Sequence, residues 1–293
     1  MMRWWFLLWL AGCCPISIDL EPRPEEREEP PPPEKGEVHL GDAAFPAGNP
    51  AAPVQHPWWV KRLEPPRYRL GYKVPEPTAS QLREDYHRYA RSVGHRRLDK
   101  NRFQWSPPAR CFGGLHCVYE ELIEEGREPI APISALFEER ARVAKLSSLD
   151  AAELVLTFVQ EVRYEIPDDE PFGVLPPPLV VRLKYGDCDS KSLLGHMILA
   201  RLGIDSVLIS SEAHKHTMLG VALPAPGTSF EWQGRRYAFV ETTAKHSPIG
   251  HINPQLLRPN DWRVVAMRVT PPIKTTPSPI GADNVIGGAI RIP

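Results

Sequence analysis

Cys188 has the strongest capacity for covalent chemistry in this sequence. It follows the loop residues Lys184–Asp187 and opens a stretch whose apolar residues recur at helical spacing, so the sequence predicts a helix from Cys188 to Gly203. The positive end of a helix dipole favours the thiolate, which is the nucleophilic form of cysteine. The first-turn N–H of Cys188 has no helical partner and can donate to an oxyanion. A small buried cysteine in a core helix is the structural alternative.

Two histidines and a carboxylate follow Cys188 at the ends of expected strands. We predict strands over residues 204–210, 217–223 and 237–243, with His214 and His216 before the second and Glu241 near the end of the third. In a cysteine–histidine–carboxylate set, the histidine takes the thiol proton and the carboxylate fixes the histidine tautomer. Strand alternation would give both histidines the same face, so their spacing leaves either as the base.

Five short segments of the chain resemble the transglutaminase-like superfamily of papain-like thiol enzymes. They are Gly186-Asp187-Cys188-Asp189-Ser190-Lys191, Leu202-Gly203-Ile204, His216 before an apolar strand, Val240-Glu241-Thr242-Thr243 and Pro248-Ile249-Gly250. The resemblance covers about residues 133–260. It implies that Cys188 is the nucleophile, His216 the general base and Glu241 the orienting carboxylate. The family more often has Asp at the third position, usually before Pro-Thr, whereas Glu241 precedes two threonines.

The same resemblance implies a fold class and a function. The fold is α+β, with a transglutaminase-like or papain-like core in which the helix bearing Cys188 packs on an antiparallel sheet bearing His216 and Glu241. The activity is thiol-dependent acyl transfer at an amide bond of a protein or peptide, peptidoglycan peptides included, by a cysteine peptidase or amidase without a cofactor. Two alternatives stay open: a non-catalytic binding or scaffold module, and a protein-crosslinking transglutaminase. The intact residue set favours chemistry over a scaffold.

Acidic residues on both sides of Cys188 raise the question of a metal. Asp187 and Asp189 are candidate calcium ligands, as flanking acids are in some members of the resembled family. Capping of the helix N-terminus is the structural alternative, and Lys191 adds a positive charge that a cation site would disfavour. A zinc site from Cys188, His214 and His216 would lack the usual ligand spacing. We therefore predict no metal.

The first fourteen residues have the pattern of a secretory signal. One positive charge at Arg3 precedes the apolar run Trp4–Leu10, which is too short to span a bilayer. The box Leu10-Ala11-Gly12-Cys13 resembles that of bacterial lipoproteins, which implies that Cys13 is lipidated and becomes the mature N-terminus. Because Cys14 rather than Asp follows, we predict an outer-membrane anchor that faces the periplasm of the cell envelope. A buried apolar N-terminal segment is the alternative.

The composition of the chain argues against nucleic acid as a partner and indicates where the chain is irregular. The chain has 293 residues with a formal net charge of −1, and a dedicated nucleic-acid binder would show a basic excess. Proline is the anomaly, because 34 residues are about 12% of the chain against a usual ~5%. We predict a signal peptide at 1–12, a Pro/Glu-rich disordered tether at 13–55, a helical and irregular extension at 56–132, a transglutaminase-like domain at 133–270 and an extended tail at 271–293.

Within the extension, helices are expected over residues 78–93 and 118–125, and the domain begins with helices at 133–145 and 147–162. Cys111 and Cys117 lie between the first two of these helices. In an exported protein we expect them to form a disulfide and to leave Cys188 free. A metal site built from the same cysteines and His116 would lack a fourth ligand.

Overall fold

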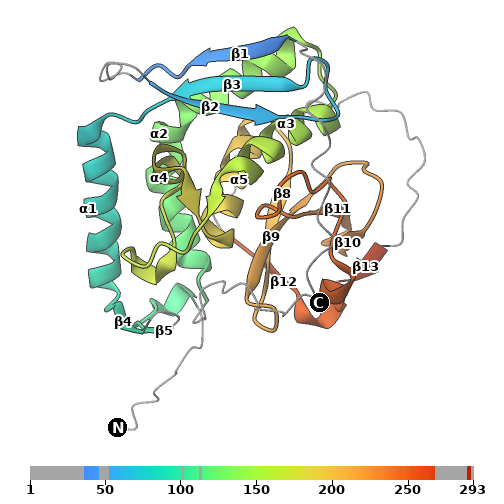
Figure 1. Cartoon of the computed structure of the whole chain (residues 1–293). Helices are drawn as coiled ribbons and strands as arrows, with labels where there is room; N and C mark the ends of the chain where they lie inside the picture. Colours follow the sequence, from blue (N-terminus) through green and yellow to red (C-terminus); the bar gives the residue numbers. More distant parts are fainter. Residues whose placement is uncertain (1–35, 46–52, 100–101, 112–113, 268–288, 292–293) are drawn as a thin grey trace, which may run out of the picture.

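The computed structural model describes residues 36–45, 53–99, 102–111, 114–267 and 289–291. It has a mixed α+β architecture, in which a three-stranded sheet lies over one end of a group of helices and a six-stranded sheet lies beside them (Figure 1). No helix within these ranges is both long enough and apolar enough to cross a membrane. The expected signal peptide, Cys13 and most of the expected tail lie outside the described residues.

The three-stranded sheet is built from the N-terminal part of the chain. Its strands are β1 (Glu37–Asp42), β2 (Val54–Trp59) and β3 (Arg67–Tyr72), in the order β1-β3-β2. The expectation of a disordered tether over 13–55 is therefore wrong for residues 37–42 and 54–55. Val38 and Leu40 alternate with polar residues and pack on the core, a period-two signal that the surrounding prolines obscured. The expected irregular stretch after residue 56 likewise contains β3 and most of β2.

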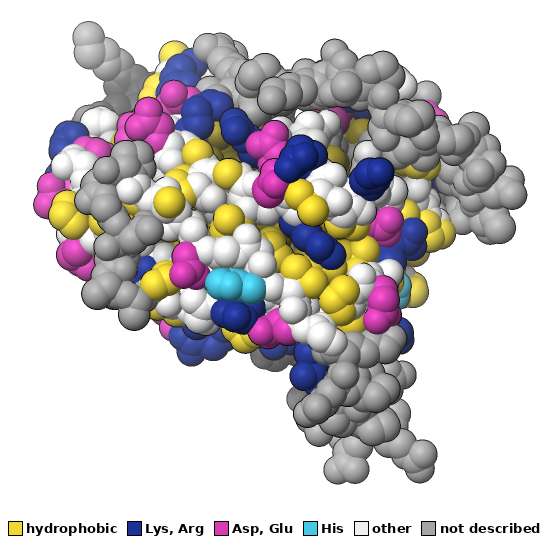
Figure 2. Space-filling view, turned by 90° about the horizontal axis from the view of Figure 1, so that it is seen from above, with side chains coloured by type: hydrophobic (Ala, Val, Ile, Leu, Met, Phe, Trp, Pro, Cys, Tyr) yellow, Lys and Arg dark blue, Asp and Glu magenta, His cyan; other side chains and the backbone are white. Residues whose placement is uncertain are grey.

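The face above this sheet carries both signs of charge. Figure 2 views the molecule from this side and shows Lys and Arg side chains interspersed with Asp and Glu. The Nε atom of Arg69 lies 2.6 Å from a carboxylate oxygen of Glu37, and the Arg67 guanidinium lies 5.7 Å from the centre of the Trp59 ring. Arginine on this face is thus matched by acidic and aromatic neighbours.

The helices form the centre of the molecule. Their bounds are Glu76–Ser92 for α1, His116–Val143 for α2, Ser148–Glu161 for α3, Pro177–Leu183 for α4 and Cys188–Arg201 for α5. The predicted start of α3 is confirmed, because Ser147 Oγ accepts the Asp150 N–H at 3.1 Å. The prolines of residues 164–178 predict a loop there, and helix α4 begins inside the end of that stretch. Short pieces connect the larger elements: η1 (Ala109–Cys111), η2 (Pro171–Gly173), η3 (Pro254–Leu256), η4 (Pro259–Asp261), the hairpin of β4 (Arg96–Asp99) and β5 (Arg102–Gln104), and the parallel pair β6 (Arg163–Tyr164) and β7 (Tyr185–Gly186).

Helix α2 is continuous, although two separate helices were expected at 118–125 and 133–145. Pro129 and Pro132 lie inside it, and each removes a backbone donor from the helix. Burial of a long apolar face offsets that loss. This face includes Val118, Leu122, Ile123, Ile130, Ile133 and Phe137. The expected boundary between residues 132 and 133 falls within α2, so the chain does not divide there.

The six-stranded sheet has the order β12-β8-β9-β11-β10-β13. Its strands are β8 (Ser206–Ser211), β9 (His216–Val221), β10 (Ser229–Trp232), β11 (Arg235–Val240), β12 (Arg263–Val265) and β13 (Ala289–Arg291). The three expected strands correspond to β8, β9 and β11. Strand β10 occupies part of what the sequence presents as a turn region over 224–234. It forms a hairpin with β11, so β9 and β11 are spatial neighbours although they are not consecutive.

Side chains of this sheet alternate between two apolar clusters. One face packs into the main apolar core, to which this sheet contributes Leu208, Leu219 and Val240. The same core contains residues of the N-terminal sheet and of the helices, and its members lie between Ala43 and Ile249 in the sequence. The opposite face forms a smaller cluster around Trp262, which is fully buried. Residues 56–132 and 133–249 thus share one core, and the expected separate extension is wrong.

Helix α5 packs closely on strand β9. Residues Cys188 to Leu199 are all buried, as expected for a central helix covered on every side. Gly195 permits the close approach, because a Cβ at this position would lie 3.0 Å from Leu219 Cδ1. This contact sets how closely helix α5 approaches strand β9, which begins with His216.

Candidate active site

The start of α5 is set by an acidic cap. Asp187 accepts the backbone N–H of Ser190 at 2.8 Å and also the Ser190 hydroxyl. The Leu175 N–H donates to the same hydroxyl at 2.8 Å, which ties the loop before α4 to the helix start. Cys188 is thus the first helical residue. Its N–H lies where no intrahelical acceptor exists, the position that the oxyanion assignment requires.

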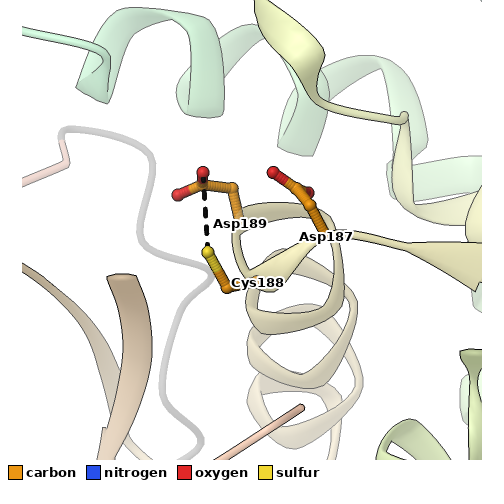
Figure 3. A group of neighbouring side chains, drawn as sticks. All are labelled: Asp187, Cys188 and Asp189. Carbon is orange, nitrogen blue, oxygen red and sulfur yellow. Dashed lines mark hydrogen bonds between the residues drawn. The ribbon is translucent and has the colours of Figure 1, made fainter. Parts of the chain in front are cut away.

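The Cys188 side chain is fully buried beside Asp189. Figure 3 shows these two side chains on one side of the helix start and the Asp187 carboxylate on the other. Cys188 Sγ lies 4.0 Å from Asp189 Oδ2. Tyr119 of α2 donates its hydroxyl to Asp189 Oδ1 at 2.6 Å. Helix α2 therefore anchors the residue that adjoins the candidate nucleophile.

Among the described residues, Asp187 and Asp189 have the carboxyl groups that are best placed to hold a cation. One ligand atom each from Asp187, Cys188 and Asp189 lie within 4.8 Å of one another. Both carboxylates already have protein donors, however, from Ser190 and Tyr119. Burial, followed by the neighbouring Asp189 charge, raises the pKa of Asp187 well above its ordinary value. The hydrogen bonds from Ser190 are typical of helix capping by Asp187.

The described cysteines differ from the expectation at one position. Cys111 and Cys117 are joined in a disulfide, with their Cα atoms 5.6 Å apart. Cys188 is also disulfide-bonded, so the expectation that it is free is wrong. Any chemistry at this sulfur therefore concerns the reduced form of Cys188, because the thiolate is the nucleophile.

His216 and Glu241 form the closest charged pair at this end of the sheet. His216 Nε2 lies 2.8 Å from Glu241 Oε2, and the side chains are 16% and 14% exposed. Glu241 Oε1 accepts both the N–H and the hydroxyl of Thr243 at 2.6 Å. The antiparallel register pairs Val240 with Leu219, which brings the end of β11 beside the start of β9. With Nε2 committed to Glu241, Nδ1 is the ring nitrogen left to exchange a proton with a thiol.

The contact between His216 and Glu241 shifts the pKa of each side chain away from its ordinary value. Burial lowers the pKa of His216, but the hydrogen bond and the charge of Glu241 outweigh it and raise the pKa overall. Burial likewise opposes ionisation of Glu241, yet hydrogen bonds from His216 and Thr243 lower its pKa to about 2. An imidazolium is therefore stabilised at this position, as a general base near neutral pH requires.

His214 has a different partner. It lies in the turn before β9 rather than in a strand, and Lys215 between the two histidines has φ of +49°. Strand alternation therefore does not relate the two rings, contrary to expectation. His214 Nε2 lies 3.1 Å from Asp261 Oδ2, within ion-pair distance but without the direction of a hydrogen bond. Of the two histidines, His216 is the one that lies within hydrogen-bond distance of the Glu241 carboxylate among the described residues.

Trp262 lies beside both histidines. Its ring centre is 5.8 Å from that of His214 and 6.3 Å from that of His216, and its Nε1 donates to the Leu256 carbonyl at 2.7 Å. Because the ring is fully buried, it removes water from one side of the histidine pair. No periodic pattern in the sequence singles out this residue, which follows the short helix η4.

A pocket of about 360 Å³ adjoins these residues. The N-terminal end of α2, the β8–β9 turn and the segment leading into β12 line it. Tyr119 contributes from α2, Leu115 from the residue before it, and Asp261 and Arg263 from the segment that leads into β12. Since Tyr119 also donates to Asp189, it is shared by the pocket and the start of α5. The volume lies within the range of small-molecule and side-chain sites.

Three buried polar residues near the site were not identified from the sequence. Gln160 donates its amide to the carbonyls of Glu241 and Ser247, and Lys191 donates to the carbonyls of Gln160 and Val162. Burial lowers the pKa of Lys191 to about 8. Ser192 contacts the hydroxyl of Thr242. Polar residues on otherwise apolar helices were the available signal, but their partners are distant in sequence.

Comparison of the chain with family models, with curated proteins and with solved structures finds no match.

Proposed function

We propose that this chain is a thiol-dependent acyl-transfer enzyme of the transglutaminase-like superfamily, acting on amide bonds as a cysteine peptidase or amidase. The observation that carries the proposal is the His216–Glu241 pair at 2.8 Å, on the sheet against which the Cys188 helix packs. Buried histidine–carboxylate pairs also serve structural roles, but this one lies on the sheet that packs against the helix beginning at Cys188. The adjoining pocket offers a place for part of a peptide substrate.

The reaction follows from these positions. The reduced Cys188 thiolate attacks the amide carbonyl, and the Cys188 N–H donates to the resulting oxyanion. The His216 imidazolium, stabilised by Glu241, gives its proton to the leaving amine as the C–N bond breaks. This step leaves a thioester and a neutral imidazole. Water, deprotonated by His216, then attacks the thioester and releases a carboxylic acid and the thiol.

A paired incubation tests this proposal. Reduced wild-type protein and Cys188→Ala are incubated with envelope proteins and with peptidoglycan peptides, and products are identified by mass spectrometry. We expect cleavage products, or amine-linked products if an amine resolves the thioester, from the wild type only. A Cys111→Ser/Cys117→Ser variant controls for reduction of the other disulfide and should keep the activity. Equal products from wild type and Cys188→Ala would contradict the proposal.

A second candidate function is a non-catalytic binding or scaffold module. Two observations favour it: Cys188 is fully buried, and it is disulfide-bonded. In that case Cys188 would contribute packing and covalent stability rather than a nucleophile. The same incubation separates the two, because a scaffold would bind a partner equally well before and after Cys188→Ala and would yield no products.

The proposed location is the bacterial outer membrane, through a lipid on Cys13. The Leu10-to-Cys13 box supports this, and Cys13 lies outside the described residues. Expressed in a Gram-negative bacterium, the protein should partition into the detergent phase, whereas Cys13→Ala should be released or incompletely processed. Intact-mass analysis decides the outcome, since an unmodified Cys13 or a retained Met1 would contradict lipidation.

A further inference from the structure

The face of α5 that points at the sheet carries a second polar residue below the candidate nucleophile. Ser192 follows Cys188 by four positions, so both lie on the same side of the helix, about 6 Å apart along its axis. Ser192 is fully buried. A serine in a central helix usually returns its hydroxyl to a carbonyl of its own helix. Ser192 instead reaches two other elements.

Its two partners adjoin the two other residues of the proposed triad. Ser192 Oγ lies 3.1 Å from the hydroxyl oxygen of Thr242, the residue after Glu241. It also donates at 3.5 Å to the carbonyl of Thr217, the residue after His216. If Ser192 donates to Thr217, then Thr242 supplies the proton in the first contact. One hydroxyl thereby connects the helix of Cys188 to the chain at His216 and at Glu241.

Gln160 holds the same segment from the other side. Its amide nitrogen donates to the Glu241 carbonyl at 2.9 Å and to the Ser247 carbonyl at 2.8 Å, which closes the loop between these residues. Gln160 is 2% exposed, and Thr242 is fully buried. The Glu241 backbone is therefore fixed by neutral hydrogen bonds away from water, where such bonds are strong.

We propose that Ser192 and Thr242 form a positioning pair that holds Glu241 against His216 and sets both relative to Cys188. The inference rests on the proposed function for its catalytic meaning, but the hydrogen bond and its effect on His216 do not require activity. Neither residue touches the reacting atoms. The pair acts through the placement of the Glu241 carboxylate, and a misplacement of about 1 Å can cost about 10²-fold in rate.

The test compares two substitutions at one position in the reduced, detergent-solubilised full chain. Thr242→Val keeps the shape and removes the hydroxyl, whereas Thr242→Ser keeps the hydroxyl. Thr157→Val is the matched control, because Thr157 is a buried threonine that donates only within its own helix. The readouts are the His216 imidazole pKa from histidine NMR titration, with His216→Gln as the assignment variant, and kcat separately from KM.

We expect Thr242→Val to lower the His216 pKa, because burial lowers it when Glu241 no longer holds the ring. We also expect a fall in kcat of about 10²-fold with KM nearly unchanged. Thr242→Ser should restore both values, and Thr157→Val should leave both as in the wild type. Ser192→Ala removes the same contact from the helix side and should reproduce Thr242→Val, which covers the case that one of them fails to fold.

An unchanged His216 pKa in either folded variant would overturn the positioning pair. So would an equal shift in Thr157→Val, because the effect would then reflect general loosening of the core. If wild type and Cys188→Ala show the same lack of products, the proposed function fails. The pKa comparison still decides whether Ser192 and Thr242 hold the histidine–carboxylate pair.

Discussion

Replacing His216 with Ala is expected to lower kcat/KM of the reduced protein at pH 7 by about 10³-fold. In the proposed reaction, the substitution removes both the base that takes the Cys188 proton and the acid that protonates the leaving amine. Steady-state kinetics on any peptide found to be cleaved measures the effect. Binding should survive, so most of the loss should be in kcat.

His214→Ala is the matched control for this prediction. His214 pairs with Asp261 and makes no contact with Glu241 among the described residues, so its removal should change kcat/KM only a few-fold. Alkylation of reduced Cys188 by iodoacetamide gives a second readout. We expect its midpoint to lie below the ~8.5 pKa of a free thiol and to rise in His216→Ala. A loss of activity in His214→Ala with an active His216→Ala would transfer the role of base to His214.

The His216–Glu241 pair is also expected to make stability depend on pH. The pKa of Glu241 is lowered from 4.5 to about 2, so its contribution is fully present above pH 4.5 and is lost as the pH falls toward 2. A shift of this size corresponds to about 3 kcal/mol of unfolding free energy. The raised pKa of His216 makes stability depend on pH in the opposite direction. Its contribution to the unfolding free energy is present below pH 6.5 and is lost as the pH rises through the raised value. The two shifts describe one interaction and are counted once.

Urea unfolding between pH 7 and pH 2 measures this contribution as the difference between wild type and Glu241→Gln. The difference isolates the pair, because the raised pKa of Asp187 works in the opposite sense and is common to both proteins. The two unfolding free energies should converge as the pH falls from 4.5 toward 2 and should be fully separated above pH 4.5. Parallel curves over the whole range would show that Glu241 carries no depressed pKa.

Local patterns predicted the elements that carry the site. The apolar spacing after Cys188, the Ser147 cap of α3 and the apolar runs of β8, β9 and β11 all come from neighbours in sequence, and the structure has each of them. The continuity of α2 through Pro129 and Pro132 was not predictable, because burial against distant elements offsets the local cost. Strand β1 was hidden for the same reason, since its pairing partner β3 is about thirty residues away.

The candidate site shows the same division. Cys188, His216 and Glu241 were identified by residue type and order, and the structure brings His216 to Glu241. The choice of His214 or His216 as the partner of Glu241 depended on the turn at Lys215 and on the ion pair with Asp261. Strand spacing predicts neither of these features. Gln160, Ser192 and Tyr119 act through partners 25 to 87 residues away, so no local pattern could assign them.

Helix α2 has a consequence for how this chain loses its structure. The Tyr119 end reaches the start of α5, and the Pro129 carbonyl accepts the hydroxyl of Tyr72 in the N-terminal sheet. At 1.5 Å per residue its 28 residues span about 42 Å. One helix therefore contacts both the N-terminal sheet and the start of α5. Local opening near Tyr119 or near Pro129 would therefore disturb the same helix, which favours a single cooperative unit. Amide exchange at α5 and at β3 should then report similar opening free energies rather than two separate foldons.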